Sequence, residues 1–170
     1  MLSSRGGSQT SAVDDLDKGI GEATEQATSL ISTLEGRGSI EIRTDTQQTT
    51  VVESDIKSKY PVVVLGEQYD IVGNDLFASA LELSRTPWVV STYDLQIICD
   101  LLHPLSFISY VSQRPRVTKN EMIRALDEID LFGWWLNNDK QFPTLPEDSF
   151  MMVMDYSRDV ARQLNFKYEP

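Results

Sequence analysis

One stretch of the chain, residues 88–113, constrains the fold more than any other. It reads WVVSTYDLQIICDLLHPLSFISYVSQ and opens with an apolar run, Trp88–Ser91, that is typical of a short buried strand. Ser91 and Asp94 have the spacing of a capping box, so we expect a helix to begin directly after the strand. Pro104 suits the first position of a second helix. The stretch therefore predicts a strand followed by two helices that cover a sheet.

The single cysteine and the single histidine of the chain both lie in this stretch. Cys99 falls on the apolar face that Leu95 and Ile98 begin, which predicts a buried, unreactive thiol. His103 lies at the junction of the two helices, where a hydrogen bond to the backbone is a commoner role than general-base catalysis. One cysteine and one histidine exclude an internal disulfide framework and a Cys/His zinc site.

A second apolar run, residues 60–66 (YPVVVLG), lacks the alternation of a half-exposed strand and is typical of a strand covered on both faces. A helix is expected at residues 75–84, between this run and Trp88–Ser91. Strand, helix and strand at this spacing form a βαβ unit, whose two strands are parallel. The middle of the chain is thus predicted to form the centre of a sheet.

The N-terminal part is predicted to contain a helix and two strands. Residues 1–13 are rich in Ser, Gly and Thr and are expected to form a loop or a disordered leader. A helix is expected at residues 14–35, ended by the glycines that follow it. Strands are expected at residues 39–44 and 49–56, separated by a polar bridge.

The C-terminal part is predicted to be mainly helical. The Arg-Pro-Arg sequence at residues 114–116 is expected to break the preceding helix, and a helical region should follow from Thr118 to Asn137, either as one helix or as two shorter pieces divided at Gly133. A loop is expected next, because the sequence that follows is polar and contains prolines. Residues 150–170 are ambiguous between a strand at residues 150–154 and a helix through Arg162.

The predicted fold class is α/β: a mixed sheet with at least one βαβ unit, flanking helices and a helical C-terminal extension. The predicted domains are the leader at residues 1–13, an α/β core at residues 14–113 and the extension at residues 114–170, packed on the core. A chain of 170 residues is long enough for one domain with a substantial core.

The charge of the chain restricts its partners. A formal net charge of -11 and a pI near 4.4 oppose binding to nucleic acid, although a local basic patch remains the alternative. We expect the clustered cations to be solvated side chains: Arg114, Arg116 and Lys119, and Lys57 with Lys59. No apolar run reaches the ~18 residues of a membrane helix, and the N-terminus lacks the apolar core of a signal peptide. We therefore expect no membrane partner and a cytoplasmic location.

The sharpest catalytic pattern is an acidic residue, Asp45, followed by Asp55 and Lys57 in a D-x-K sequence on the next strand-like segment. Metal-dependent nucleases use such a pattern to bind Mg²⁺ and to place a lysine beside the attacked phosphate. The pattern is short, and no helix is expected after the lysine, so an exposed strand end is the competing interpretation. A magnesium cofactor is expected only if this site is real.

Other polar and aromatic groups have structural interpretations. The acidic group Asp127, Glu128 and Asp130 suits the positive end of a helix dipole, without a metal. The aromatic pair Trp134 and Trp135 is expected to pack on the core rather than to stack on bases. The sequence contains no phosphate-binding glycine loop, no G-x-S-x-G sequence and no H-E-x-x-H sequence. The residues alone therefore give no support to an ordinary enzyme.

Three stretches resemble a known group of proteins: KGIGEATEQATSL at residues 18–30, YPVVVLG at residues 60–66, and the sequence from Pro87 through the LDEIDLFGWWL segment ending at Leu136. Together they are similar to the C-terminal part of nuclease-related, restriction-endonuclease-like bacterial proteins of an uncharacterised group. The resemblance implies that the metal-binding acid and its E-x-K strand precede Lys18, but residues 1–17 contain no such strand and no E-x-K sequence. It also implies a role for Gln26, whose side chain would orient water or a phosphate at the edge of an active site.

Two functions follow as hypotheses. The first is a part of a restriction-endonuclease-like protein that lacks the metal-binding strand, holds no cofactor, is inactive alone and works with the remainder of a longer chain. The second is a non-enzymatic protein-interaction or regulatory module with a protein partner. The density of Trp, Phe and Met after Phe132 favours this second function, because it exceeds what a small domain needs to cover its sheet.

Overall fold

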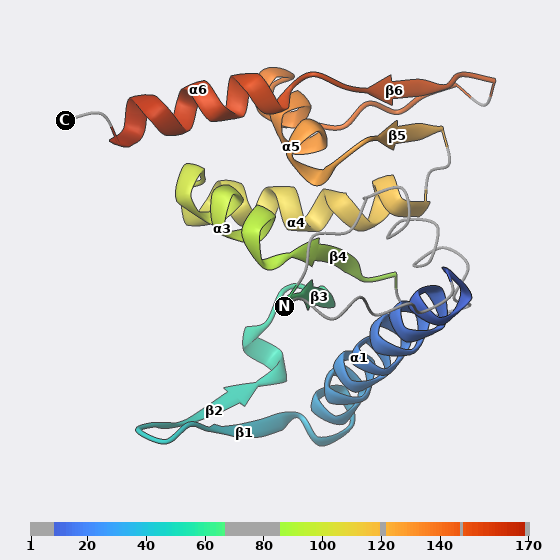
Figure 1. Cartoon of the computed structure of the whole chain (residues 1–170). Helices are drawn as coiled ribbons and strands as arrows, with labels where there is room; N and C mark the ends of the chain where they lie inside the picture. Colours follow the sequence, from blue (N-terminus) through green and yellow to red (C-terminus); the bar gives the residue numbers. More distant parts are fainter. Residues whose placement is uncertain (1–8, 67–85, 120–121, 147, 169–170) are drawn as a thin grey trace, which may run out of the picture. The chain divides into compact units, whose positions relative to one another are not determined.

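A computed structural model describes residues 9–66, 86–119, 122–146 and 148–168 (Figure 1). The chain belongs to the predicted mixed α/β class and divides into two compact units, Met1–Pro61 and Val62–Pro170. This division falls after Pro61, whereas the sequence placed a domain boundary after Gln113. Each unit is described by itself below. None of the described helices is long and apolar enough to cross a membrane.

The N-terminal unit consists of the long helix α1 (Gln9–Arg37), a hairpin of β1 (Ser39–Arg43) and β2 (Gln48–Val52), and the short 3-10 helix η1 (Glu53–Asp55). The helix begins at Gln9, so the prediction that residues 9–13 belong to a leader is wrong. Those residues contain neither Gly nor Pro, and nothing in them stops the helix from extending toward the N-terminus.

The end of α1 leads directly into the hairpin. Gly38 has a φ of 74° and donates its N–H to the carbonyl of Leu34 at 2.8 Å, which is the left-handed cap that glycine favours. β1 and β2 pair antiparallel. Lys59 holds the base of the hairpin against the helix, because its Nζ lies 3.1 Å from a carboxylate oxygen of Glu35 and 2.7 Å from one of Glu53.

The C-terminal unit contains the predicted parallel strand pair. β3 (Val62–Leu65) and β4 (Trp88–Ser91) run parallel in the register Val62↔Trp88. This pairing confirms the expected strand order of a βαβ unit, and the helix expected at residues 75–84 lies outside the described residues. The chain then enters α3 (Thr92–Leu101), where the hydroxyl of Ser91 accepts the N–H of Asp94 at 3.0 Å, as the capping box predicts.

Helix α4 (Pro104–Lys119) corrects the predicted break at residues 114–116, because it continues through Pro115. Proline removes one hydrogen bond inside the helix. The neighbours Arg114 and Val117 are buried, so packing in the unit holds the helix together across the gap.

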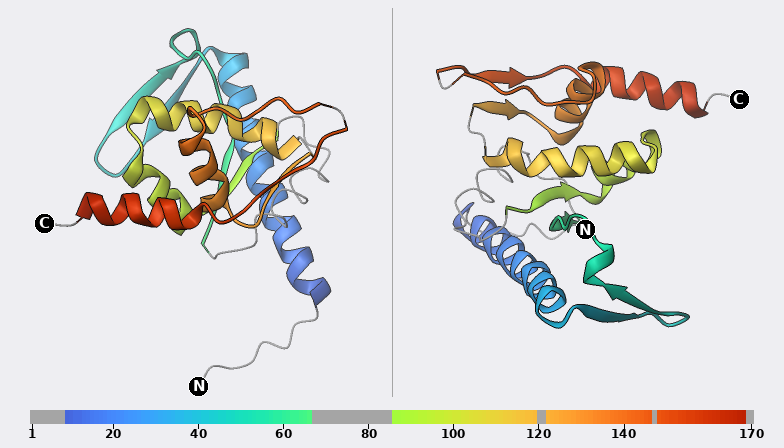
Figure 2. Two further views of the ribbon diagram at one scale, coloured as in Figure 1. Left: turned by 90° about the horizontal axis from the view of Figure 1, so that it is seen from above. Right: turned by 180° about the vertical axis from the view of Figure 1, so that it is seen from behind.

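The predicted helix from Thr118 to Asn137 is also wrong in part, since a strand interrupts it. The chain forms β5 (Ile123–Ala125), α5 (Glu128–Asn137), β6 (Met151–Val153) and α6 (Ser157–Tyr168). β5 and β6 are parallel neighbours with α5 between them in the sequence, which is a second strand–helix–strand arrangement (Figure 2). A strand as short as β5 has no period of its own, and its partner strand decides its conformation. The sequence left the C-terminal end open between a strand at residues 150–154 and a helix through Arg162, and the structure contains both, as β6 and α6.

The core of the C-terminal unit is rich in aromatic side chains. The larger cluster of buried residues comprises Trp88, Val90, Ile98, Tyr110, Val111, Ile129, Phe132, Trp135 and Val160. The smaller cluster lies around β5 and β6 and comprises Val117, Ile123, Ala125, Leu131 and Val153. Trp135 is a core residue, as predicted. Cys99 is exposed rather than buried, because Ile98 and not its neighbour takes the inward position of α3.

Candidate functional site

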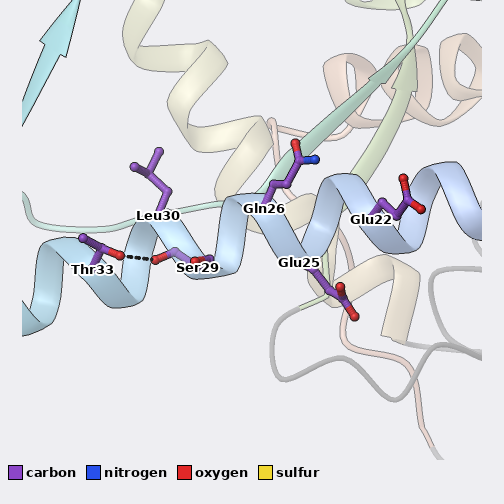
Figure 3. Close-up of a pocket in the computed structure, with 6 residues that line it drawn as sticks. All are labelled: Glu22, Glu25, Gln26, Ser29, Leu30 and Thr33. Carbon is purple, nitrogen blue, oxygen red and sulfur yellow. Dashed lines mark hydrogen bonds between the residues drawn. The ribbon is translucent and has the colours of Figure 1, made fainter.

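Gln26, the residue that the family resemblance singles out, is exposed on α1. It borders an open hollow of about 560 Å³ whose described lining also includes Glu22, Glu25, Ser29, Leu30 and Thr33. Figure 3 shows the amide of Gln26 and the side chain of Leu30 on one side of the helix and the carboxylate of Glu25 on the other. The described lining carries carboxylates and no cation, so its charge disfavours a phosphate group.

The structure does not bring Asp45, Asp55 and Lys57 together. Asp45 lies in the turn beyond the Arg43↔Gln48 pair, and Asp55 ends η1 beyond the Ser39↔Val52 pair, so the two carboxylates are at opposite ends of the hairpin. The D-x-K sequence is not on a strand, since β2 ends at Val52. Among the residues that the structure describes, no group of three His, Cys, Asp or Glu side chains is arranged to hold a metal ion.

The cysteine and the histidine have local environments that do not favour catalysis. The Nδ1 atom of His103 accepts the N–H of Leu105 at 3.4 Å, which confirms the expected bond to the backbone at the start of α4. Desolvation raises the pKa of the Cys99 thiol, and the charge of Asp100 raises it further. A raised pKa lowers the fraction of reactive thiolate at neutral pH.

Two members of the predicted acidic group act as helix caps. Asp127 accepts the N–H of Asp130 at 2.6 Å and caps α5. The carboxylate of Asp130 accepts the N–H of Ser157 at 2.7 Å, where α6 begins. Burial is the largest cause of the raised pKa of Asp127, and the nearby charges of Asp130 and Asp94 contribute. Because these carboxylates stabilise helix ends, they have structural roles.

The third member, Glu128, and the cation Arg114 form a buried network that the sequence did not predict. Arg114 was expected to be solvated, but its side chain is 0% exposed and that of Glu128 is 3% exposed. Oε1 of Glu128 also accepts the indole N–H of Trp88 at 3.0 Å and the hydroxyl of Tyr110 at 2.6 Å. The network ties β4, α4 and α5 together inside the core, where no ligand reaches it.

A row of exposed apolar side chains lies on and beside β6 in the C-terminal unit. Phe150, Met152 and Met154 are 64%, 44% and 48% exposed, and we call these side chains the β6 stripe. Met152 lies within β6, where successive residues point to opposite faces, and Phe150 and Met154 flank the strand at alternate positions that are also exposed. Val153 points the other way and is 1% exposed in the smaller core cluster. The strand therefore has one apolar face in the core and a second apolar face in the solvent.

The outer edge of β6 is also open among the described strands, because β6 pairs with β5 alone there. Leu126, which follows β5, is a further exposed apolar residue, at 53%. The sequence signals this surface only by its density of Phe and Met, because residues 150–154 (FMMVM) are all apolar and do not alternate. The sequence does not show that Val153 is buried, and this burial fixes the direction in which each residue of β6 points.

Comparison with protein-family models, with curated proteins and with solved structures finds no match to this chain.

Proposed function

We propose that the chain is a non-enzymatic protein-binding module and that the β6 stripe is its binding surface. The observation that carries the proposal is the row of large apolar side chains, Phe150, Met152 and Met154, each at least 44% exposed. Exposed apolar residues that occur singly are ordinary, whereas a contiguous row marks an interaction site. Methionine is flexible and polarisable, so such a surface adapts to its partner.

The remaining candidate sites support the same proposal. Asp45 and Asp55 lie at opposite ends of the hairpin, and Gln26 borders a hollow with carboxylates in its lining. The buried ion pair of Arg114 and Glu128 has no access to solvent. None of these arrangements supplies a nucleophile or a base beside a place for a substrate.

The proposal is tested by selecting peptides from a random library displayed on phage against the immobilised chain. A variant in which serine replaces all three residues of the β6 stripe, F150S/M152S/M154S, is the comparison. We expect the selected peptides to bind the variant at least ~10-fold more weakly, because serine removes most of the apolar area.

A matched control removes apolar area elsewhere in the same unit. Leu105 and Ile108 on α4 are 73% and 57% exposed, and the variant L105S/I108S should bind the selected peptides like the unchanged chain. If the selected peptides bind the stripe variant as tightly as they bind the unchanged chain, the β6 stripe is not the binding surface.

A second candidate is the nuclease-related part implied by the resemblance. It is favoured by the exposed position of Gln26 on α1 and by the parallel pairing of β3 with β4 in the C-terminal unit. In this case the isolated chain should not cut DNA, with or without Mg²⁺, and Q26A should weaken binding of a labelled DNA duplex in fluorescence anisotropy. Equal DNA binding by Q26A would remove this candidate. Magnesium-dependent cutting that Lys57→Ala abolishes would instead support the site of Asp45, Asp55 and Lys57.

A further inference from the structure

We propose that β6 binds its partner by strand addition, and that the partner segment is extended, alternates apolar residues and carries Lys or Arg at both ends. The inference rests on the proposed function of the β6 stripe and specifies the class of partner. Three features of β6 support it: the direction of its backbone groups, the spacing of its exposed side chains and the charge around it.

The backbone of β6 offers hydrogen-bonding groups at its outer edge. The N–H of Met151 donates to the carbonyl of Met122 at 2.7 Å, so the polar groups of Met151 face β5. Because these groups alternate in direction along a strand, the N–H and C=O of Met152 face away from β5. On that side the described residues form no further strand. An extended segment placed there gains main-chain hydrogen bonds, as in other cases of strand addition.

The side chains of the β6 stripe give such a segment a specific pattern. Phe150, Met152 and Met154 are exposed at every second position, with Met152 in β6 and the other two on either side of it. Alternate side chains of an added strand lie next to them, at the distance over which cross-strand pairs interact. A partner with apolar residues at every second position therefore extends the apolar face, while its other residues point to the opposite face.

The charge around β6 favours a basic partner over a second copy of this chain. Asp148 and Asp155 are exposed at the two ends of the stripe, and residues 141–157 contain neither Lys nor Arg. Arg124, the neighbour of Met152 on β5, donates to the carbonyl of Ile123. Antiparallel pairing of two β6 strands would place Asp148 of one chain near Asp155 of the other, and like charges in that position repel. A net charge of -11 adds to this repulsion and attracts a cationic segment.

The test uses a defined probe, the fluorescein-labelled and amidated peptide Lys-Thr-Val-Thr-Val-Thr-Val-Thr-Lys, titrated with the full chain in fluorescence anisotropy. We expect saturable binding that is at least ~10-fold weaker when the central valine of the peptide is N-methylated, because methylation removes one main-chain donor. Replacing both lysines of the peptide by glutamate should weaken binding by a similar factor.

A pair of protein variants separates the backbone of Met152 from its side chain. Met152→Pro removes the outward N–H, and proline is tolerated at an edge position where the N–H is not used in the ladder. Met152→Thr shortens the side chain but keeps the N–H. We expect Met152→Pro to bind the peptide at least ~10-fold more weakly than Met152→Thr does. Circular dichroism and the thermal midpoint check that each variant is folded, and the methylated peptide provides the same test with the protein unchanged.

The outcomes distinguish this inference from the proposed function. Equal binding of the methylated and unmethylated peptides, equal binding of the glutamate peptide, or no binding of the lysine peptide overturns the inference. If the peptides selected from the phage library still require the β6 stripe, the proposed function survives that result. If F150S/M152S/M154S binds both the lysine peptide and the selected peptides as tightly as the unchanged chain, the proposed function fails as well.

Discussion

Arg114 and Glu128 form a two-pronged ion pair in the interior of the C-terminal unit. Nε of Arg114 donates to both carboxylate oxygens of Glu128 at 3.0 Å, and Nη2 donates to Oε2 at 2.9 Å. Nη1 donates to the hydroxyl of Thr118 at 2.8 Å, so each nitrogen of the guanidinium donates at least one hydrogen bond. A charged pair without solvent is stable only when its hydrogen bonds are satisfied in this way.

Removing the cation alone should therefore destabilise the fold strongly. Arg114→Met leaves the carboxylate of Glu128 buried without its counter-charge, and we expect the free energy of unfolding to fall by about 3–5 kcal/mol. Urea unfolding followed by circular dichroism measures the change. Arg116→Met, an exposed neighbour on the same helix, should stay within about 0.5 kcal/mol of the unchanged chain.

The double variant Arg114→Met/Glu128→Leu should recover part of the loss, because no charge then remains buried. Recovery will be incomplete, since Trp88 and Tyr110 both donate to Glu128 and lose their acceptor. A loss below about 1 kcal/mol in Arg114→Met would mean that the pair is exposed to solvent in the folded protein.

Gly133 of α5 tests how closely this helix packs on the start of α6. A Cβ atom at this position would lie 2.8 Å from the Cβ and the carbonyl oxygen of Tyr156, and 2.9 Å from a methyl carbon of Val160. We expect Gly133→Ala to lower the free energy of unfolding by about 1–3 kcal/mol, because backbone must move to make room. In Gly36→Ala, where nothing lies within 4 Å, the same change should instead stabilise α1 by about 0.5–1 kcal/mol. If Gly133→Ala and Gly36→Ala both raise the free energy of unfolding, the close packing at Gly133 is contradicted.

The parts of the fold that the sequence predicted are those with local signals. The cap of Ser91 on α3 follows from residues next to each other in the chain, and the β3–β4 pair follows from two apolar runs. The pairing of Arg114 with Glu128 links residues 14 positions apart through the packing of two helices, and each residue alone resembles a solvated charge. Local sequence carries no information on such a contact.

The candidate site was predictable only in part for the same reason. The apolar run at residues 150–154 fits a strand, but either of its faces could be the buried one. The register Ala125↔Val153 decides the matter, because it brings Val153 into the core cluster and turns Met152 outward. This register cannot be predicted from the sequence, because β5 has only three residues and shows no period.

The stability of the chain should depend on pH through Asp94. Burial raises the pKa of this carboxyl, and the hydrogen bond from Ser91 opposes the rise. Because the folded pKa lies above the unfolded value of about 3.9, the folded state holds the proton more tightly. The free energy of unfolding should then fall as the pH rises from about 4 through the folded pKa. Urea unfolding across this range measures the fall.

Asp94→Asn should make that fall smaller, because the side chain no longer titrates. Asp127 has a pKa raised in the same direction, so part of the fall should remain. Ser91→Ala removes the hydrogen bond that lowers the pKa of Asp94 and should make the fall larger. An Asp94→Asn variant with the same pH profile as the unchanged chain would show that Asp94 does not contribute.

The direction of β6 decides whether the β6 stripe exists, and two alanine variants test it. Val153 is 1% exposed and Met152 is 44% exposed. We expect Val153→Ala to lower the free energy of unfolding by about 1–3 kcal/mol and Met152→Ala to change it by less than about 0.5 kcal/mol. A one-residue slip in the pairing with β5 would exchange the two faces and reverse this order. Because the reversed result would bury Phe150, Met152 and Met154, it would remove the surface on which both proposals depend.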